Sequence, residues 1–289
     1  MEPRQAHGGH TAPRVDGGEL RSRAPMTNGP LASLRIVAVR PDREEERATA
    51  ERVLGGPLVG RDDLAVRRGR RPGGTGELWQ GDGWFLKSRA LRKYEQLDQA
   101  TSALDGLFAV KRALGELSPA QSILAVAATT GGAYQLWTIA PQLVSLRERL
   151  DATSAAARWD DFAGALAGYD LALGESLSSS IDAGICLDPS PTNFATQGGR
   201  VRYIADDVAA NRDAAGLEEA FVARFAEYPD APAAVWDAYV WRFVRELTLR
   251  LSPRDRSRLQ LANRLRAAAL RRCAGRPYVD RVLAALEAL

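Results

Sequence analysis

The chain has 289 residues, 45% of them hydrophobic, and a formal net charge of only +3. This size suits one large or two small lobes, with enough apolar side chains to fill a core. Its two histidines, His7 and His10, lie in a head rich in Gly, Pro and Arg, and its two cysteines are Cys186 and Cys273. These counts exclude a histidine-based catalytic triad in the folded body, a His-ligated metal site and a cysteine-rich metal cage.

The head, residues 1–30, has few large apolar side chains, which predicts a disordered tail. It contains no apolar run of signal-peptide length, and no stretch of about 18 apolar residues occurs elsewhere. We therefore expect a cytoplasmic protein without a membrane partner. The oligomeric state stays open.

Residues 31–141 predict a small antiparallel sheet with helices. Alternating apolar residues and turn signals indicate the strands, and the Gly81–Gly83 turn between aromatic and aliphatic residues predicts a hairpin. A charged segment after the first strand predicts a short helix with Asp42 as its N-cap. In chain order we expect strands at 34–39, 64–70, 77–80, 84–87, 122–127 and 133–139, and helices at 42–54 and at 91–114, the latter broken near Gly106.

From residue 142 onward, apolar residues recur every three or four positions, which predicts amphipathic helices facing a core. The expected helical segments are 159–173, 221–228, 236–251, 259–270 and 279–289. One irregular polar insert, 185–208, interrupts them. The predicted fold class is thus α+β, with a β-rich lobe at 31–141 and a helical lobe at 142–289.

The polar insert carries the candidate chemistry. Asp188 is followed five residues later by Asn193, and a Gly-Gly hairpin then leads to Asp206 and Asp207. One carboxylate can take the proton of a hydroxyl group, while an amide and a second carboxylate supply the hard oxygen ligands that magnesium prefers. None of these roles requires a histidine.

This segment resembles the catalytic and metal-binding segments of the protein-kinase-like fold, most closely those of the aminoglycoside phosphotransferase and choline kinase branch. In that branch the segment commonly reads His-Gly-Asp-Leu-His-Pro-x-Asn, followed by a short hairpin and Ile-Asp. Here residues 186–187 are Cys-Leu in place of His-Gly, and residues 204–206 are Ile-Ala-Asp in place of Ile-Asp. The likeness in the order of elements covers roughly residues 64–250, and its specific part is 186–207.

The resemblance implies a bilobal fold and an ATP- and Mg²⁺-dependent phosphotransferase that acts on a hydroxyl group of a small-molecule acceptor. It makes Asp188 the catalytic base and Asn193 and Asp206 the magnesium ligands. Asp207 is an open second choice for the metal.

The same resemblance implies nucleotide-binding residues upstream. Lys87, one of three lysines in the chain, ends a predicted strand where the resemblance expects the lysine that contacts the α- and β-phosphates. Residues 136–141 resemble the hinge strand that binds adenine and include Thr138 and Ala140. The residues placed to cover the phosphates are Gly73, Gly74 and Gly76. The acidic partners available to Lys87 on the following helix are Glu95, which we prefer, Asp98 and Asp105.

Other interpretations of these residues stay open. Asp188 and Asn193 are ordinary turn residues, and the same fold can serve nucleotide binding without transfer, as in a pseudokinase. Residues 242–281 hold twelve Arg against three acidic residues, a local balance of +9. This segment predicts a solvated face, a surface for nucleic acid or another polyanion, or a site for an anionic acceptor.

Overall fold

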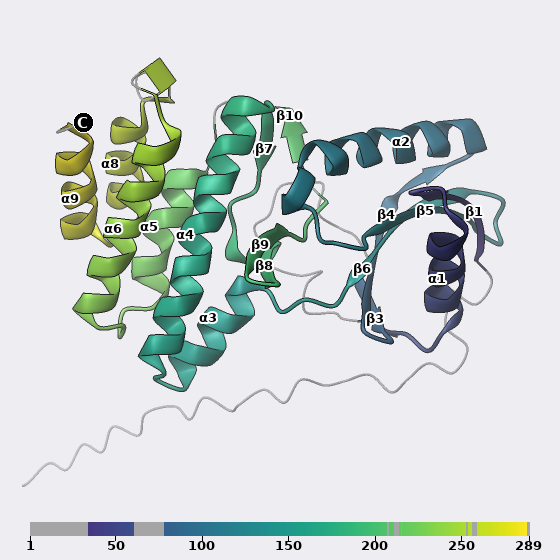
Figure 1. Cartoon of the computed structure of the whole chain (residues 1–289), viewed down its shortest axis with the longest axis horizontal. Coiled ribbons are helices and arrows are strands. Elements are labelled where there is room, and N and C mark those ends of the chain that lie inside the picture. Colours follow the sequence, from purple (N-terminus) through teal and green to yellow (C-terminus); the bar gives the residue numbers. More distant parts are fainter. Residues whose placement is uncertain are drawn as a thin grey trace, which may run out of the picture.

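The computed structural model describes residues 34–60, 78–206, 208–210, 214, 216–252, 254–255 and 259–287. It has an α+β fold in which an antiparallel sheet with two helices lies at one end and the remaining helices lie at the other (Figure 1). The predicted tail at 1–30 and the predicted strand at 64–70 lie outside the described residues.

The sheet has six antiparallel strands in the order β1-β5-β6-β4-β3-β2. Five of the expected strands are present. The strand expected at 84–87 is β4, which is longer than predicted because it continues to Tyr94. The bounds are β1 (Arg35–Arg40), β2 (Val59–Gly60), β3 (Leu78–Gly81), β4 (Trp84–Tyr94), β5 (Ile123–Ala128) and β6 (Tyr134–Pro141).

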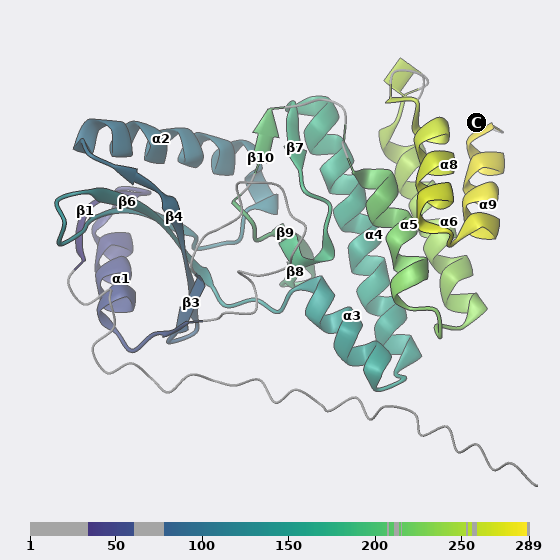
Figure 2. The ribbon, with the colours of Figure 1, turned by 180° about the vertical axis from the view of Figure 1, so that it is seen from behind.

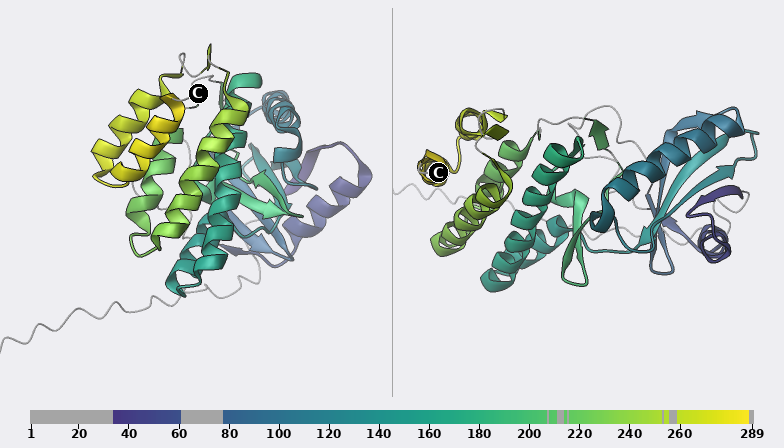
Figure 3. Two further views of the ribbon diagram at one scale, coloured as in Figure 1. Left: turned by 60° about the vertical axis from the view of Figure 1, so that its left-hand side comes forward. Right: turned by 45° about the horizontal axis from the view of Figure 1, so that its top comes forward.

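Helices α1 (Glu44–Gly55) and α2 (Leu97–Ala113) cover opposite faces of this sheet (Figure 3). The alternation of side chains along β5 and β6 shows which residues face each helix. Ile139 packs with the α1 cluster, whereas Leu136 packs with the α2 cluster. At the C-terminal end of α2, Leu114 and Leu117 join the core of the distant helices instead.

The starts of both helices that cover the sheet differ from their predictions. α1 begins at Glu44 with Arg43 at the N-cap, so the expectation of Asp42 as the cap was wrong. α2 begins only at Leu97, because the preceding residues extend β4 through pairing with β6, and such tertiary pairing overrides local propensity. Gly106 does not break α2, since one glycine costs only about 1 kcal/mol and the buried face of the helix offsets it.

The other end of the molecule is helical, with a core rich in stacked aromatic rings such as Phe221 on Phe243. α3, which no prediction covered, begins at a capping box formed by Ser145 and Glu148. The bounds are α3 (Leu146–Ala155), α4 (Trp159–Asp182), α5 (Leu217–Glu227), α6 (Ala233–Arg250), α8 (Leu261–Arg272) and α9 (Arg276–Glu287). Of the helices described, none is long and apolar enough to cross a membrane.

The polar insert lies between the sheet and the helices (Figures 1 and 2). β7 pairs with β10, and β8 forms an antiparallel hairpin with β9. The bounds are β7 (Ile185–Leu187), a 3₁₀ turn at Pro191–Asn193, β8 (Phe194–Gln197), β9 (Arg200–Tyr203) and β10 (Val208–Ala210). The insert that carries the candidate residues therefore lies between the two ends of the molecule (Figures 1 and 2).

Candidate functional site

Lys87 and Thr138 lie side by side on the face of the sheet that α2 covers. They are directly opposite each other in the pairing of β4 with β6. The neighbouring pair, Leu86 and Ile139, packs against α1, and because side chains alternate between the two faces of a sheet, Lys87 and Thr138 lie on the α2 face. From this face Nζ of Lys87 lies 3.8 Å from Oδ2 of Asp206, which follows β9. Thr138 also helps to lower the pKa of the Asp206 carboxyl. The sheet and the polar insert thus meet at one carboxylate.

Asp206 is 2% exposed and has a second lysine partner. Nζ of Lys111, on α2, lies 2.8 Å from Oδ1 of Asp206 and donates a hydrogen bond of 3.2 Å to the main-chain oxygen of Ala205. Burial alone would raise the pKa of Asp206, but the two lysine charges and the hydrogen bonds that the carboxylate accepts hold the pKa well below its usual range. Asp206 is therefore an anion throughout the neutral pH range.

Asp188 is exposed, in the loop that follows β7. Its Oδ1 accepts a hydrogen bond of 3.0 Å from the main-chain N–H of Ser190, and its own N–H donates one of 3.3 Å to the hydroxyl of Tyr203. The hydroxyl of Tyr169, on α4, donates to the carbonyl oxygen of Pro189 at 2.7 Å. Buried tyrosines therefore fix the loop backbone on both sides of a carboxylate that faces solvent.

Asn193 connects this loop to the hairpin. Its Nδ2 donates a hydrogen bond of 3.3 Å to the main-chain oxygen of Asp188. Its main-chain carbonyl oxygen accepts a hydrogen bond of 2.8 Å from the N–H of Ile204. Within the part of the chain that the structure describes, Oδ1 of Asn193 has no hydrogen-bond partner. The hairpin β8–β9 thereby brings Asn193, at its start, close to the segment that leads into Asp206.

Asp206 and Asn193 offer a carboxylate and an amide oxygen, which are hard ligands of the kind that magnesium prefers. The donor set fits a magnesium ion that also binds phosphate oxygens, because such ions are held by only one or two protein ligands. Among the described residues there is no group of three or more His, Cys, Asp or Glu that could hold a metal ion by itself. A metal here would need a phosphate-bearing ligand to complete its coordination.

The acidic residues that the sequence offered to Lys87 lie elsewhere. Glu95 is exposed in the bend between β4 and α2, and Asp98 is exposed in the first turn of α2. Asp105 pairs with Arg40 at 2.7 Å. Among the described residues, the carboxylate that pairs with Lys87 is Asp206.

Of the other expected nucleotide-binding residues, Ala140 is half-buried on β6, opposite Phe85 of β4. Thr138 is buried, and it helps to lower the pKa of Asp206. The other four expected site residues lie outside the described residues: Gly73, Gly74, Gly76 and Asp207.

Lys111 is the site residue that the sequence analysis missed. The buried positions of α2 are Ala100, Leu104, Leu107 and Lys111, at steps of four, three and four. A lysine on the apolar face of an amphipathic helix must find a counter-charge, because an unpaired buried ammonium is strongly unfavourable. This periodicity, applied to one of only three lysines, was the signal that could have identified it.

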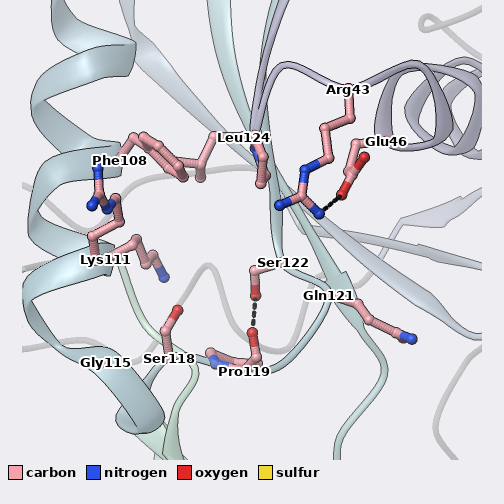
Figure 4. Close-up of a pocket in the computed structure, with 12 residues that line it drawn as sticks. Arg43, Glu46, Phe108, Lys111, Gly115, Ser118, Pro119, Gln121, Ser122 and Leu124 are labelled. Carbon is pink, nitrogen blue, oxygen red and sulfur yellow. Dashed lines mark hydrogen bonds and ion pairs between the residues drawn. The ribbon is translucent and has the colours of Figure 1, made fainter.

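A cavity of about 430 Å³ lies next to this site and shares Lys111 with it (Figure 4). Phe108 and Lys111 form its wall on α2, while Leu124 and the pair of Arg43 and Glu46 form the opposite wall. Lys111 thus lines the cavity and also contacts Asp206 with its ammonium group.

The arginines of residues 242–281 are extensively paired. Among the described residues, seven of these arginines form ion pairs with carboxylates, most of which belong to segments outside this range. The pairs are Arg242 with Asp170, Arg250 with Glu175 and Glu246, Arg264 with Glu218, Arg266 with Glu287, Arg271 and Arg272 with Glu219, and Arg281 with Asp237. The positive excess along the sequence is therefore reduced in space by neighbouring helices.

Comparisons of the chain with protein-family models, with curated proteins and with solved structures find no match. The site itself is therefore the basis for a functional assignment. It combines an exposed carboxylate on a fixed loop, an amide, a buried anionic carboxylate and two ammonium groups. This set can orient a hydroxyl group, accept its proton and neutralise phosphate charge.

Proposed function

We propose that the chain is a phosphotransferase of the protein-kinase-like fold, which moves the γ-phosphate of ATP to a hydroxyl group of a small-molecule acceptor. The observation that carries this proposal is the ion pair of 3.8 Å between Lys87 of the sheet and Asp206 of the insert. The insert also holds Asp188 and Asn193 through hydrogen bonds within the same loop and hairpin. Residues far apart in the sequence thus supply the groups that phosphoryl transfer needs.

The sheet topology supports the same proposal. The lysine strand β4 lies between the meander strand β3 and the strand β6, so that Lys87 is adjacent to the residues expected to bind adenine. We accordingly propose a bilobal arrangement, with residues 31–141 as the nucleotide-binding lobe and 142–289 as the acceptor-binding lobe. ATP would bind between the sheet and the insert.

Each residue has a role that follows from its environment. Asp188, exposed on a fixed loop, would accept the proton of the acceptor hydroxyl. Lys87 would bind phosphate oxygens through its ammonium group. Asn193 and Asp206 would hold magnesium, which supplies neutralisation of the phosphate charge when it is bound.

A pseudokinase that binds nucleotide without transferring phosphate is the second candidate. It is favoured by one specific observation, namely that both carboxylate oxygens of Asp206 face lysine ammonium groups. A third candidate, a protein that binds polyanions through the C-terminal arginines, is less well supported because seven of these arginines are paired with carboxylates.

Binding and transfer measured on the same protein test the proposal. ATP binding is measured by calorimetry with and without Mg²⁺, and transfer is measured with labelled ATP against a panel of aminoglycosides, amino alcohols and sugars. We expect Asp188→Asn to retain ATP binding and to lose transfer by at least about 100-fold, the contribution of a general base. Asp182→Asn, which changes an exposed carboxylate at the end of α4, is the matched control and should transfer like the wild type.

The outcomes separate the candidates. Absence of ATP binding by the wild-type protein would contradict both the phosphotransferase and the pseudokinase. Mg²⁺-dependent binding without transfer to any member of the panel would favour the pseudokinase. Salt-dependent binding of nucleic acid that survives Asp188→Asn, without ATP binding, would favour the polyanion-binding protein.

A further inference from the structure

The contacts of Lys111 show that its ammonium group belongs to the candidate site and not to the surface. Lys111 is 8% exposed, on the apolar face of α2, whereas Lys87 is 26% exposed. A buried ammonium is tolerated only where it is paired and hydrogen-bonded. Lys111 meets both conditions through Asp206 and the carbonyl group of Ala205.

The two oxygens of Asp206 have different partners. Oδ1 is 2.8 Å from the buried ammonium of Lys111, a close charge-assisted contact. Oδ2 is 3.8 Å from the more exposed ammonium of Lys87, which is a longer and weaker contact. Lys111 therefore holds one oxygen of Asp206, and the other oxygen faces Lys87, the more exposed of the two lysines.

The helix that carries Lys111 is fixed close to this contact. Glu116, in the 3₁₀ turn Gly115–Leu117 after α2, pairs with Arg200 of the hairpin. The main-chain N–H of Ala120 donates a hydrogen bond of 3.2 Å to Oε1 of Gln197 in the same hairpin. The hairpin that leads into Asp206 thus also holds the end of α2 from which Lys111 extends.

We propose that Lys111 is a positioning residue for Asp206, which holds Oδ1 and the adjoining main chain so that Oδ2 is presented to magnesium and the nucleotide phosphates. The helix α2 then contributes a cation that acts on the metal-binding carboxylate, in place of an acidic partner for Lys87. This inference rests on the proposed function, because it assigns a role in metal binding at the same site.

Metal binding in the absence of turnover tests this role. Mn²⁺ binding in the presence of ADP is titrated by electron paramagnetic resonance for the wild-type protein, Lys111→Met, Lys111→Arg and Arg112→Met. We expect Lys111→Met to weaken Mn²⁺ binding at least about tenfold, because the carboxylate is then free to turn toward Lys87. ADP binding without metal should stay within about twofold of the wild type, since Lys87 is intact.

Two of these variants serve as controls. Lys111→Arg keeps the positive charge that pairs with Oδ1 of Asp206, so we expect Mn²⁺ binding within about threefold of the wild type. Arg112 is the next residue of α2 and is exposed, so Arg112→Met should bind Mn²⁺ like the wild type.

A second measurement needs no substitution of Lys111. Because the chain has three lysines, protein labelled with ¹³C at lysine Cε gives three side-chain signals, which Lys87→Arg and Lys93→Arg assign. On addition of Mg²⁺ and ADP we expect the Lys87 signal to shift and the Lys111 signal to keep its position. This arm decides the matter if Lys111→Met does not fold.

Wild-type affinity for Mn²⁺ in Lys111→Met would overturn the inference and leave the proposed function intact. Displacement of Lys111 from Asp206 when Mg²⁺ and ADP bind, seen as a shift of its signal to that of a solvated lysine, would also overturn it. If the wild-type protein binds neither ADP nor Mn²⁺, the proposed function fails and the inference fails with it.

Discussion

The hydroxyl group of Tyr169, in the middle of α4, donates a hydrogen bond of 2.7 Å to the main-chain oxygen of Pro189. Tyr169 is fully buried, and burial raises the pKa of its hydroxyl, so the group stays a neutral donor. Pro189 directly follows Asp188, the candidate base. The helical core therefore sets the position of the exposed carboxylate through one hydrogen bond to its neighbour.

Replacing Tyr169 by Phe removes this hydrogen bond and keeps the aromatic packing. We expect about 1 kcal/mol of lost unfolding free energy. Transfer should slow by about tenfold, because Asp188 is then less well oriented toward the acceptor. Urea unfolding and turnover measure the two effects. Tyr278→Phe is the control, since the ring of Tyr278 stacks on Phe225 at the other side of the helical core. An equal loss of turnover in Tyr278→Phe would contradict the role of Tyr169.

Lys87 is expected to bind the nucleotide phosphates. Lys87→Met keeps most of the apolar stem but removes the ammonium group that faces Asp206. We expect ATP affinity to fall by at least about tenfold, which corresponds to one charge-assisted contact. Calorimetry measures this change. Lys93→Met alters an exposed lysine further along β4 and should bind ATP like the wild type. If Lys87→Met also binds ATP like the wild type, Lys87 does not bind the nucleotide phosphates.

Asp170 gives a prediction about pH and stability that is independent of function. This α4 carboxylate is buried against Arg242 and Glu246 of α6, and burial raises its pKa well above the usual range although Arg242 opposes the shift. A raised pKa in the folded state contributes stability below the ordinary value of about 3.9, and that stability is lost as the pH rises through the folded-state pKa.

Asp170→Asn keeps the shape of the side chain and cannot ionise. Its unfolding free energy should therefore increase relative to the wild type as the pH rises from about 4 to about 8. Urea unfolding at several pH values checks this trend. Asp161→Asn, at an exposed position of the same helix, should show no such pH-dependent gain. A stability difference that does not vary with pH would show that Asp170 titrates normally.

The capping box at the start of α3 is the fourth point that can be tested. The hydroxyl of Ser145 accepts from the main-chain N–H of Glu148 at 3.1 Å, and the Glu148 carboxylate accepts from the N–H of Ser145 at 2.9 Å. Ser145→Ala should cost about 1 kcal/mol of unfolding free energy, as measured by thermal or urea unfolding. Ser154→Ala, within α3, should be neutral or slightly stabilising because alanine favours helix.

Local patterns predicted much of the fold. The turn at Gly81–Gly83 and the alternation along β5 and β6 are short-range signals, and the strands they indicated are present. The extension of β4 to Tyr94 was not predictable in this way, because it depends on pairing with Tyr134, forty residues later. α3 was missed although Ser145 and Glu148 carry the spacing of a capping box.

In the candidate site, too, the features set by local sequence were predictable and those set by long-range packing were not. The spacing of Asp188 and Asn193 is local, and the structure joins the two through a hydrogen bond. The partner of Lys87 is not local: the sequence offered Glu95 on the following helix, whereas the pairing carboxylate is Asp206. Which face of α2 turns toward the insert depends on how this helix packs on the sheet, and a pattern of charges along the chain does not contain that information.

The two ends of α2 differ in how deeply they are buried. Leu114 and Leu117 embed the C-terminal end of the helix in the distant core, while Leu97 at its other end is 39% exposed. A tilt of the helix of about 10° about its embedded end at Leu114 would move Leu97 by roughly 4 Å, since the seventeen residues between them span about 25 Å, and would move Lys111 much less. The contact between Lys111 and Asp206 therefore lies near the embedded end of α2, where a tilt of the helix would displace it least.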